Sequence, residues 1–311
     1  MSENIPLVSI IMPSYNSAQY LVPAIQSVIS QTFTDWELLI FNDGSTDNTE
    51  DVVKPLLTDK RIQYIEQENL GQPKTRNKGV RMSKGKYIAL LDADDIWMPD
   101  KLEKQIAVFE KYPDAGVCGT GIELIRPDGT VFGQNLCNPF YGRAVPALIT
   151  GQLQVAMSAS ITRKDVFKQV GFWDEGFLPF SMDYDFWLRA SLVCMFYNIE
   201  EKLIQYRTGH PSISSEGSDK RRNLVMNIVV PRFVKEYGGS KYVKWYHVWQ
   251  LYASCYFGKA MNRPDWFART YWLFRSFFAY PFQRDTNTAL IGQFLPARLN
   301  TALKSCFRSI F

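Results

Sequence analysis

Short apolar runs alternate with segments of helical spacing along the N-terminal third of the chain. The runs that we predict as strands are Leu7–Met12, Trp36–Phe41, Arg61–Glu66 and Tyr87–Leu91. The segments that we predict as helices, because their apolar positions recur every three or four residues, are Tyr20–Ile29, Thr49–Leu57 and Thr75–Ser83. Strands that alternate with helices form βαβ units. The pattern therefore predicts an α/β fold with a mostly parallel, Rossmann-like sheet flanked by helices.

The remainder of the chain has a different pattern. We predict a hairpin over Gly116–Gly133 and helices over Arg163–Val170 and Met182–Leu192. Aromatic residues crowd the chain from Arg221 onward, and one helical face there carries Trp245, Trp249, Tyr252 and Tyr256. With Ser212–Asp219 as the linker, we expect an α/β domain over residues 1–219 and a helical region over residues 220–311.

Charge is distributed unevenly between these two parts. The chain has a net charge of +4, but residues 220–311 hold 15 Lys and Arg against 3 Asp and Glu, together with 21 aromatic residues. This mixture, seen around Trp266–Phe282 and in a predicted end helix over Leu299–Phe311, suits the interfacial zone of an anionic bilayer. Internal or dimer packing would explain the same spacing, whereas nucleic acid fits poorly. No stretch reaches the roughly 18 apolar residues of a membrane span, so any membrane contact should be peripheral.

Cysteine content and the N-terminus suggest a compartment. The five cysteines are widely spaced, and no two of them form a CxxC pair. Such a set argues against both a disulfide framework and a zinc site. The first strand begins after only a few residues, with no positive segment and no sustained apolar segment before it, so we expect no secretion signal. These features fit the reducing cytosol.

Three carboxylates, Asp92, Asp94 and Asp95, follow the fourth predicted strand. Because parallel strands present their carboxyl ends at one edge of a sheet, the acidic turn Asp43–Asp47 should lie nearby. Like charges this close are costly unless a cation neutralises them. Mg²⁺ and Mn²⁺ take oxygen ligands and leave positions for phosphate oxygens, so the cluster predicts a metal and a diphosphate. For a single aspartate, capping of the helix that begins near Pro99 is the alternative.

Four other positions could carry chemistry, each with a simpler alternative. Asp43 could bond a ribose hydroxyl, although its sequence is also that of a common turn. The cations after Gly71 could contact a diphosphate or face solvent. Asp183 and Asp185 enter a helix beside aromatic residues, so one of them is a candidate general base or a helix cap. His210 lies in a glycine-containing loop, where a metal or diphosphate contact competes with simple exposure.

In their order along the chain, these segments resemble the inverting glycosyltransferase family 2, whose catalytic domain has the GT-A fold. The resembling segments are Val8–Asn16, Asp43–Asp47, Asn69–Gly79, the DxD motif Asp92–Asp95, Gly171–Glu175 and Asp183–Arg189. The resemblance covers about residues 6–215 and rests on all of the pieces together. Two positions depart from the family pattern. Met182 stands where the family usually has a glutamate, and His210 follows Arg207 at a spacing one residue wider than usual.

The resemblance implies a role for each matched residue. The nucleotide pocket would be lined by Pro13, Tyr15, Asp43, Arg76 and Asp92. A Mn²⁺ or Mg²⁺ ion would be bound by Asp94, Asp92 and His210. Asp183 matches the catalytic base, and the acceptor side would include Trp173, Asp174, Glu175 and Asp185.

The implied reaction is a direct displacement at the anomeric carbon, in which Asp183 deprotonates the acceptor hydroxyl and the configuration inverts. We expect a UDP-sugar donor, the commonest in the family, and a saccharide or lipid-linked acceptor of surface polysaccharide or glycolipid biosynthesis. The site of action would be the cytoplasmic face of the plasma membrane, and a homo-oligomer remains open. A sugar-nucleotide-binding protein that has lost catalysis is the alternative, and Met182 and the wider spacing between Arg207 and His210 are its support. A sugar nucleotidyltransferase is another, but Pro13–Ser17 lacks the glycine-rich, cationic loop that it needs.

Overall fold

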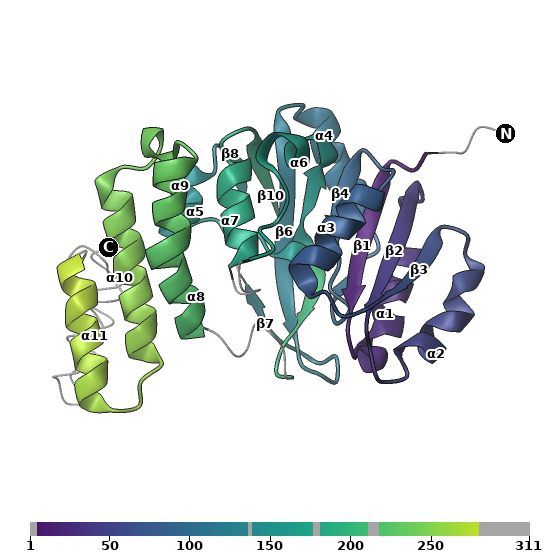
Figure 1. Ribbon diagram of the computed structural model, residues 1–311, viewed down its shortest axis with the longest axis horizontal. Coiled ribbons are helices and arrows are strands. Elements are labelled where there is room, and N and C mark those ends of the chain that lie inside the picture. The colour runs from purple at the N-terminus through teal and green to yellow at the C-terminus, as the bar shows by residue number, and fades with distance from the viewer. Residues whose placement is uncertain (1–4, 136–138, 177–180, 211–217, 280–311) are drawn as a thin grey trace. The chain divides into compact units, whose positions relative to one another are not determined.

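The computed structural model describes residues 5–135, 139–176, 181–210 and 218–279 (Figure 1). The chain divides into two compact units. Unit 1 consists of Met1–Leu148 and Gln152–Ser218, and unit 2 of Ile149–Gly151 and Asp219–Phe311. Most of the predicted linker and all of the predicted end helix over Leu299–Phe311 lie outside the described residues.

Within the described residues, unit 1 is built on a sheet of 10 strands. The strands are β1 (Val8–Ser14), β2 (Trp36–Asp43), β3 (Ile62–Gln67), β4 (Tyr87–Leu90), β5 (Ile96–Trp97), β6 (Ala115–Ile125), β7 (Val131–Asn135), β8 (Phe140–Gly142), β9 (Ile161–Arg163) and β10 (Met195–Arg207). Their order is β3-β2-β1-β4-β9-β6-β10-β5, with β7 beside β6 and β8 beside β10. The neighbours among β3, β2, β1 and β4 are parallel, as are β6 and β10.

The sheet is mixed, because β9 inserts between β4 and β6 in the antiparallel direction. Tyr87 of β4 pairs with Arg163, and Cys118 of β6 pairs with Ile161. A strand of three residues is too short for its period to be detected in the sequence. The predicted parallel arrangement therefore holds for the first four strands and for β6 with β10.

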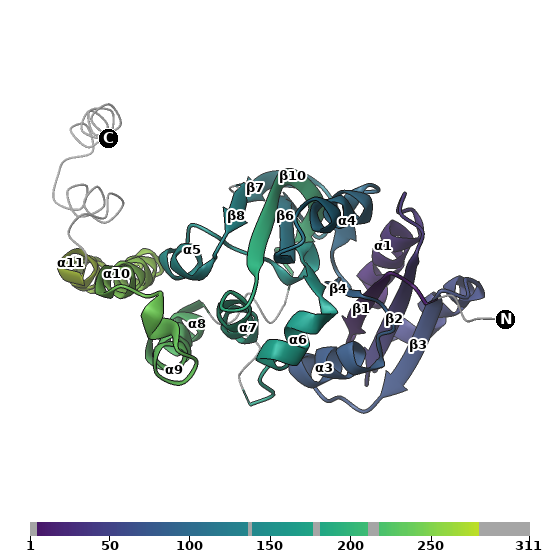
Figure 2. The same ribbon diagram turned by 90° about the horizontal axis from the view of Figure 1, so that it is seen from above.

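Helices cover both faces of this sheet (Figure 2). The helices are α1 (Ala18–Ile29), α2 (Thr49–Val53), α3 (Gln72–Met82), α4 (Lys101–Lys111), α6 (Lys164–Val170) and α7 (Met182–Ala190), with 3-10 helices over Lys54–Thr58 and Met157–Ala159. A further helix, α5 (Val145–Thr150), includes residues of both units. Seen from above, α1 and α4 lie on one side of the sheet and α3, α6 and α7 on the other.

Every residue of β1, β2 and β4 is buried, which explains why these strands are continuous apolar runs. One boundary differs from the sequence prediction, since β1 continues through Pro13 to Ser14. The pairing of β1 with β4 ends at Ile11 and Leu90, so Pro13 pairs only with Phe41 of β2. The missing amide of Pro13 therefore interrupts no hydrogen-bonded ladder on the side of β4.

The part of unit 2 that the structure describes is helical, as predicted for the C-terminal region. Its elements are α8 (Ser218–Leu224), a π-helix over Val225–Val229, α9 (Val230–Glu236), a 3-10 helix over Gly239–Lys241, α10 (Trp245–Met261) and α11 (Trp266–Ala279). The last two helices form an antiparallel hairpin (Figure 1). In the described parts of the chain, we find no helix with the length and apolar character needed to span a bilayer.

Candidate functional site

Hydrogen bonds tie together the loops that follow β1 and β2. The amide of Asn16 donates to Ser45 Oγ (3.0 Å), and the amide of Thr46 donates to Asn16 Oδ1 (2.8 Å). Asn16 has a φ of 49°, in the left-handed region that asparagine tolerates better than most residues. Two residues of the predicted nucleotide pocket lie here, of which Pro13 is buried and Tyr15 is 52% exposed. The Tyr15 side chain is thus accessible to a ligand.

Asp43, at the end of β2, binds the loop before α3 with both carboxylate oxygens. Its Oδ1 accepts from Gln67 Nε2 (2.7 Å) and the Leu70 amide (2.9 Å), and its Oδ2 accepts from the Gly71 amide (2.9 Å). Gly71 has a φ of 81°, a conformation that favours glycine. Asp43 therefore shapes the loop, and its predicted contact with a nucleotide stays a prediction.

Arg76 in α3 forms an ion pair with Asp92 at the start of the acidic loop. The Arg76 side chain is 3% exposed and that of Asp92 is 25% exposed. The Nε of Arg76 is buried and has no hydrogen-bond partner among the described residues. A buried N–H without a hydrogen-bond partner carries a desolvation cost. The structure thus brings together two residues of the predicted nucleotide pocket.

Two backbone amides fix the acidic loop after β4. The Asp92 amide donates to Ser158 Oγ (3.0 Å), and Asp95 Oδ1 accepts from the Arg207 amide (3.0 Å). Burial, followed by the charges of Asp94 and Asp92, raises the pKa of Asp95 well above its ordinary value. Burial and then the Asp92 charge also raise the pKa of Asp94. The loop therefore concentrates negative charge that a bound cation would stabilise.

His210 reaches this loop despite its wider spacing from Arg207. His210 Nε2 lies 2.9 Å from Asp94 Oδ2. Gly209 has a φ of 84°, which lets the chain turn between the two residues. The Tyr20 ring from α1 contacts both His210 and Arg207. The centroids of the Tyr20 and His210 rings lie 5.2 Å apart, and the Arg207 guanidinium lies 4.7 Å from the centre of the Tyr20 ring. The departure from the family spacing thus leaves His210 beside Asp94.

The surroundings of Asp94 fit a divalent cation that also binds phosphate oxygens. Among the residues that the structure describes, no group of three or more His, Cys, Asp or Glu side chains forms a preassembled metal site. Asp94 and His210 nevertheless place an oxygen and a nitrogen ligand side by side. One or two side chains are sufficient for Mg²⁺ or Mn²⁺ when substrate phosphates complete the coordination shell. The third predicted ligand, Asp92, is engaged by Arg76.

Helix α3 also binds the segment that follows α6. Asn77 Nδ2 donates to the Trp173 carbonyl (2.8 Å) and to Glu175 Oε1 (3.0 Å), and the Trp173 amide donates to Asn77 Oδ1 (3.1 Å). Asn77 is 1% exposed. The consecutive residues Arg76 and Asn77 therefore bind Asp92 and the predicted acceptor segment, respectively. One rigid helix joins the two halves of the candidate site.

The other two predicted acceptor residues of this segment make local contacts. Trp173 is 2% exposed, and its ring lies 5.0 Å from that of Phe186 and 5.2 Å from that of Phe167. Asp174 Oδ1 accepts from the Gly176 amide (2.8 Å) within a turn. Trp173 thus packs α6 against α7, and a direct acceptor contact of either residue stays a prediction.

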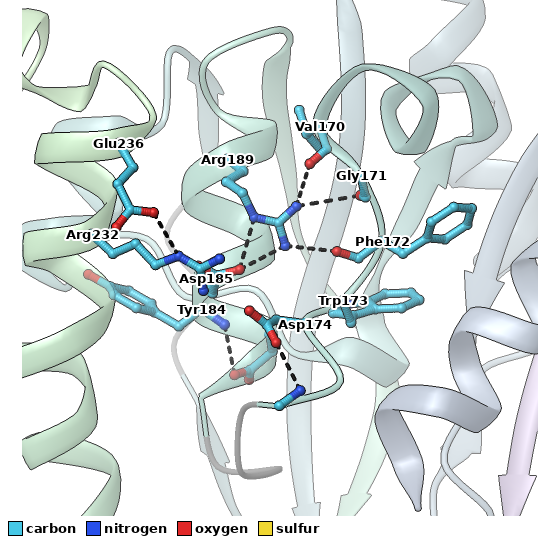
Figure 3. Close-up of polar contacts among 12 residues, drawn as sticks. Val170, Gly171, Phe172, Trp173, Asp174, Tyr184, Asp185, Arg189, Arg232 and Glu236 are labelled. Atoms are coloured by element: carbon cyan, nitrogen blue, oxygen red, sulfur yellow. Dashed lines mark hydrogen bonds and ion pairs between the residues drawn. The ribbon is translucent and has the colours of Figure 1, made fainter. Parts of the chain in front are cut away.

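Asp185 is a buried ion-pair partner in the first turn of α7 (Figure 3). Its Oδ2 accepts from Arg189 Nε (2.9 Å) and lies 2.7 Å from Arg189 Nη2. Figure 3 shows the same guanidinium reaching backbone carbonyls before Trp173, including Val170 (2.6 Å) and Phe172 (3.0 Å). The Asp185–Arg189 pair therefore fixes α7 to the predicted acceptor segment.

Asp183 lies in the same turn but is only half-buried. Its Oδ1 accepts from the Tyr184 amide (2.8 Å). Met182, which stands where the family has a glutamate, is 2% exposed and points no polar group toward a substrate. Of the two carboxylates that the sequence left as candidate bases, Asp183 is the more accessible and Asp185 is occupied by Arg189.

Several residues that hold the site together had no predicted role. These residues are Tyr20, Asn77, Ser158, Arg189 and Arg207. Apart from Arg189, which pairs with Asp185 in the same helix, each acts through a contact with a residue far away in the chain, which hydrophobic periodicity does not report. Asn77 and Arg189 lie within segments of the family resemblance, and those positions were the available signal. Ser158 lies in a 3-10 helix of 3 residues and gave none.

Comparison with known proteins places this site in context. Residues 9–171 match the family described as Glycosyl transferase family 2. The chain is 34% identical over 226 residues to the putative teichuronic acid biosynthesis glycosyltransferase TuaG of Bacillus subtilis. The aligned region covers 68% of this chain and 82% of TuaG. The chain is 32% identical over 252 residues to an uncharacterized glycosyltransferase of Rickettsia felis. The aligned region covers 77% of this chain but 40% of that protein. The chain thus spans less than half of the Rickettsia relative.

Solved structures of S. aureus TarS, residues 1–349, share the fold at 17% sequence identity. The complex with UDP-GlcNAc has a TM-score of 0.64 and covers 91% of this chain and 83% of that chain. The complex with UDP has a TM-score of 0.58, and the match covers 91% of this chain and 82% of that chain. This likeness confirms the predicted GT-A fold, a sheet flanked by helices.

Proposed function

Because the chain belongs to glycosyl transferase family 2, we propose that it transfers a sugar from a nucleotide-sugar to an acceptor hydroxyl with inversion of the anomeric configuration. The observation that carries this proposal is the pair of contacts from α3. Arg76 binds Asp92 in the acidic loop, and Asn77 binds the segment that leads to α7. Groups suited to a diphosphate and groups suited to an acceptor are thereby held by one helix.

The proposed donor is a UDP-sugar. TarS, which has the same fold, binds UDP-GlcNAc, and this supports the choice of nucleotide. The base and ribose would bind at the loops that follow β1 and β2, which contain Pro13, Tyr15 and Asp43 and are joined by the bonds of Asn16. Because the acidic loop follows the adjacent parallel strand β4, the diphosphate would extend from there toward Asp94.

The proposed metal is Mn²⁺ or Mg²⁺, with Asp94 and His210 as ligands and Asp92 beside them. When bound, such a cation would neutralise the charge that develops on the departing nucleoside diphosphate. The protein's part is to hold the ligands in place. Tyr20 packs against His210, and Arg76 holds Asp92 by an ion pair.

Asp183 is the proposed general base. Its carboxylate would accept the proton of the acceptor hydroxyl as that oxygen attacks the anomeric carbon. Attack from the side opposite the leaving group forms the new glycosidic bond and inverts the configuration. The buried pair of Asp185 and Arg189 anchors α7 and so fixes the position of Asp183 relative to the acceptor segment.

The proposed acceptor is a saccharide, free or lipid-linked, in the synthesis of a surface polysaccharide. The name of the Bacillus subtilis relative, which refers to teichuronic acid biosynthesis, supports this class. We place the reaction in the cytoplasm at the inner face of the plasma membrane, where nucleotide-sugars and lipid-linked acceptors meet. The alternative of a binding protein without catalysis rested partly on the wider spacing of His210, and the contact of His210 with Asp94 weakens it.

Release of nucleoside diphosphate from a panel of nucleotide-sugars, with and without Mn²⁺, tests the proposal. We expect Asp183→Asn to lower kcat at least about 100-fold, because general base catalysis contributes 10²–10⁴-fold. The matched control is Asp165→Asn, which removes an exposed carboxylate from the first turn of α6 and should leave the rate unchanged. Equal rates for Asp183→Asn and the native protein would overturn the assignment. Release of pyrophosphate would indicate a nucleotidyltransferase.

A further inference from the structure

One end of the α10–α11 hairpin exposes large aromatic side chains. In the first turns of α10, Trp245 is 73% exposed, Trp249 is 49% exposed and Tyr246 is 42% exposed. Near the end of α11, Phe278 is 71% exposed. The rings of Trp245 and Trp249 lie 6.5 Å apart on one face of α10. We call these four residues the aromatic end, and a cluster of this size on a surface indicates an interaction site.

The register of the two helices places these residues at the same end of the hairpin. Ser276 Oγ donates to the Ala253 carbonyl (2.7 Å), and the rings of Tyr256 and Trp272 stack 5.7 Å apart. The two helices therefore run antiparallel. The beginning of α10 lies beside the end of α11, as the hairpin in Figure 1 shows.

Positive charge accompanies the aromatic end. Lys241 and Lys244, both exposed, come directly before α10. The acidic side chains of unit 2 that the structure describes bind groups elsewhere: Asp219 with Arg222 (2.9 Å) and Arg263 (3.3 Å), Glu236 with Arg232 (3.2 Å), and Asp265 with the Ala268 amide (2.6 Å). The two lysines therefore lie beside aromatic rings, and the nearby carboxylates are committed to other partners.

We propose that the aromatic end, together with Lys241 and Lys244, docks unit 2 on an anionic lipid bilayer. Trp and Tyr rings favour the boundary between headgroups and acyl chains, and lysines are attracted to anionic headgroups. A second copy of the chain fits this surface less well. In a twofold symmetric dimer the same patch faces itself, so the lysines of the two copies would be brought together.

The docking proposal extends the proposed function, since a lipid-linked acceptor would be presented at such a surface. Binding to vesicles requires neither a donor nor an acceptor. Nucleoside diphosphate release from soluble substrates requires no bilayer. The two proposals can therefore fail separately.

Vesicle co-sedimentation of the full chain tests the docking. The probes are phosphatidylcholine vesicles with and without about one third phosphatidylglycerol. We expect the native protein to bind the anionic vesicles and to lose binding as salt rises. Trp245→Ala combined with Trp249→Ala should lower the partition coefficient at least about tenfold, and Lys241→Gln or Lys244→Gln should each lower it about fivefold.

The matched control is Met261→Ala, which truncates a side chain that is 43% exposed at the opposite end of α10. This control should bind like the native protein. All of the variants should keep the native rate of nucleoside diphosphate release, which shows that they are folded. Equal binding of the double tryptophan variant and the native protein would overturn the proposal. So would a dimer in analytical ultracentrifugation that the tryptophan variant dissociates, with no binding to anionic vesicles.

Discussion

Lys101 allows a quantitative test of the packing beneath the acidic loop. Its side chain is fully buried, with Nζ 3.9 Å from the centre of the Trp97 ring and 2.6 Å from Gln105 Oε1. Trp97 in turn donates from Nε1 to the Ser158 carbonyl (2.8 Å), and Ser158 Oγ accepts from the Asp92 amide. The charge state of Lys101 therefore concerns the support of the site itself. The perturbation that we propose is Lys101→Met, which keeps the aliphatic volume and removes the amine.

Burial lowers the pKa of Lys101 from 10.5 to about 7. In the unfolded chain the amine stays protonated up to about pH 10.5, so between pH 7 and pH 10.5 the unfolded state holds one more proton than the folded state. Stability therefore rises with pH across this window, and the full penalty applies below pH 7. Each tenfold change in proton affinity corresponds to about 1.4 kcal/mol, so the penalty is about 5 kcal/mol at most. The face of Trp97 stabilises the charged form and offsets about 1–2 kcal/mol of it.

The assay is urea unfolding of the native protein and of Lys101→Met, followed by tryptophan fluorescence between pH 7 and pH 9.5. Loss of the hydrogen bond to Gln105 costs about 1 kcal/mol at every pH. The informative quantity is therefore the pH dependence of the difference in free energy of unfolding between the native protein and Lys101→Met. From pH 7 to pH 9.5 we expect the free energy of unfolding of the native protein to rise by about 2 kcal/mol relative to that of the variant. Lys111→Met, an exposed lysine of the same helix, controls for removal of a positive charge. A difference that stays constant with pH would refute this account of Lys101.

Two further predictions concern contacts that the sequence did not reveal. Tyr20→Ala should weaken Mn²⁺ binding about tenfold, because His210 loses its packing partner, whereas Tyr20→Phe should bind Mn²⁺ normally. Isothermal titration calorimetry in the presence of UDP measures both affinities. Equal affinities for the two variants would contradict a positioning role of Tyr20. Arg189→Met should lower the free energy of unfolding in urea by about 3–5 kcal/mol, since it leaves the Asp185 carboxylate buried without its cation, and a loss below about 1 kcal/mol would show that the pair is unimportant.

The first half of the fold could be predicted from the sequence because its strands are buried on both faces. Continuous apolar runs separated by helical segments marked β1, β2 and β4 directly. The sequence prediction missed the 13-residue strand β10 and also β5, β8 and β9, which have 2 or 3 residues each. Such short strands exist because a neighbouring strand offers hydrogen bonds, and no local pattern records that neighbour.

The place of the acidic loop after a buried strand predicted a binding site there, and the family resemblance pointed to Asp183 as the candidate base. The surroundings of these residues could not be predicted. Sequence alone did not show that the carboxylate of Asp43 is occupied by two backbone amides, or that Asp185 is paired with Arg189. Asn77 and Trp173 are 96 positions apart in the chain, and only the fold brings them together. Contacts of this kind decide which of several similar carboxylates is available for chemistry.

The measurement that tests the central claim most directly is the configuration of the first sugar released. In the absence of an identified acceptor, water can accept the sugar slowly, so the purified protein is incubated with the nucleotide-sugar that gives the most nucleoside diphosphate. Proton NMR then records the anomeric signal before mutarotation. Direct displacement assisted by Asp183 predicts release of the anomer opposite to that in the donor, and Asp183→Asn should abolish the signal. Release of the same anomer as in the donor would contradict the account.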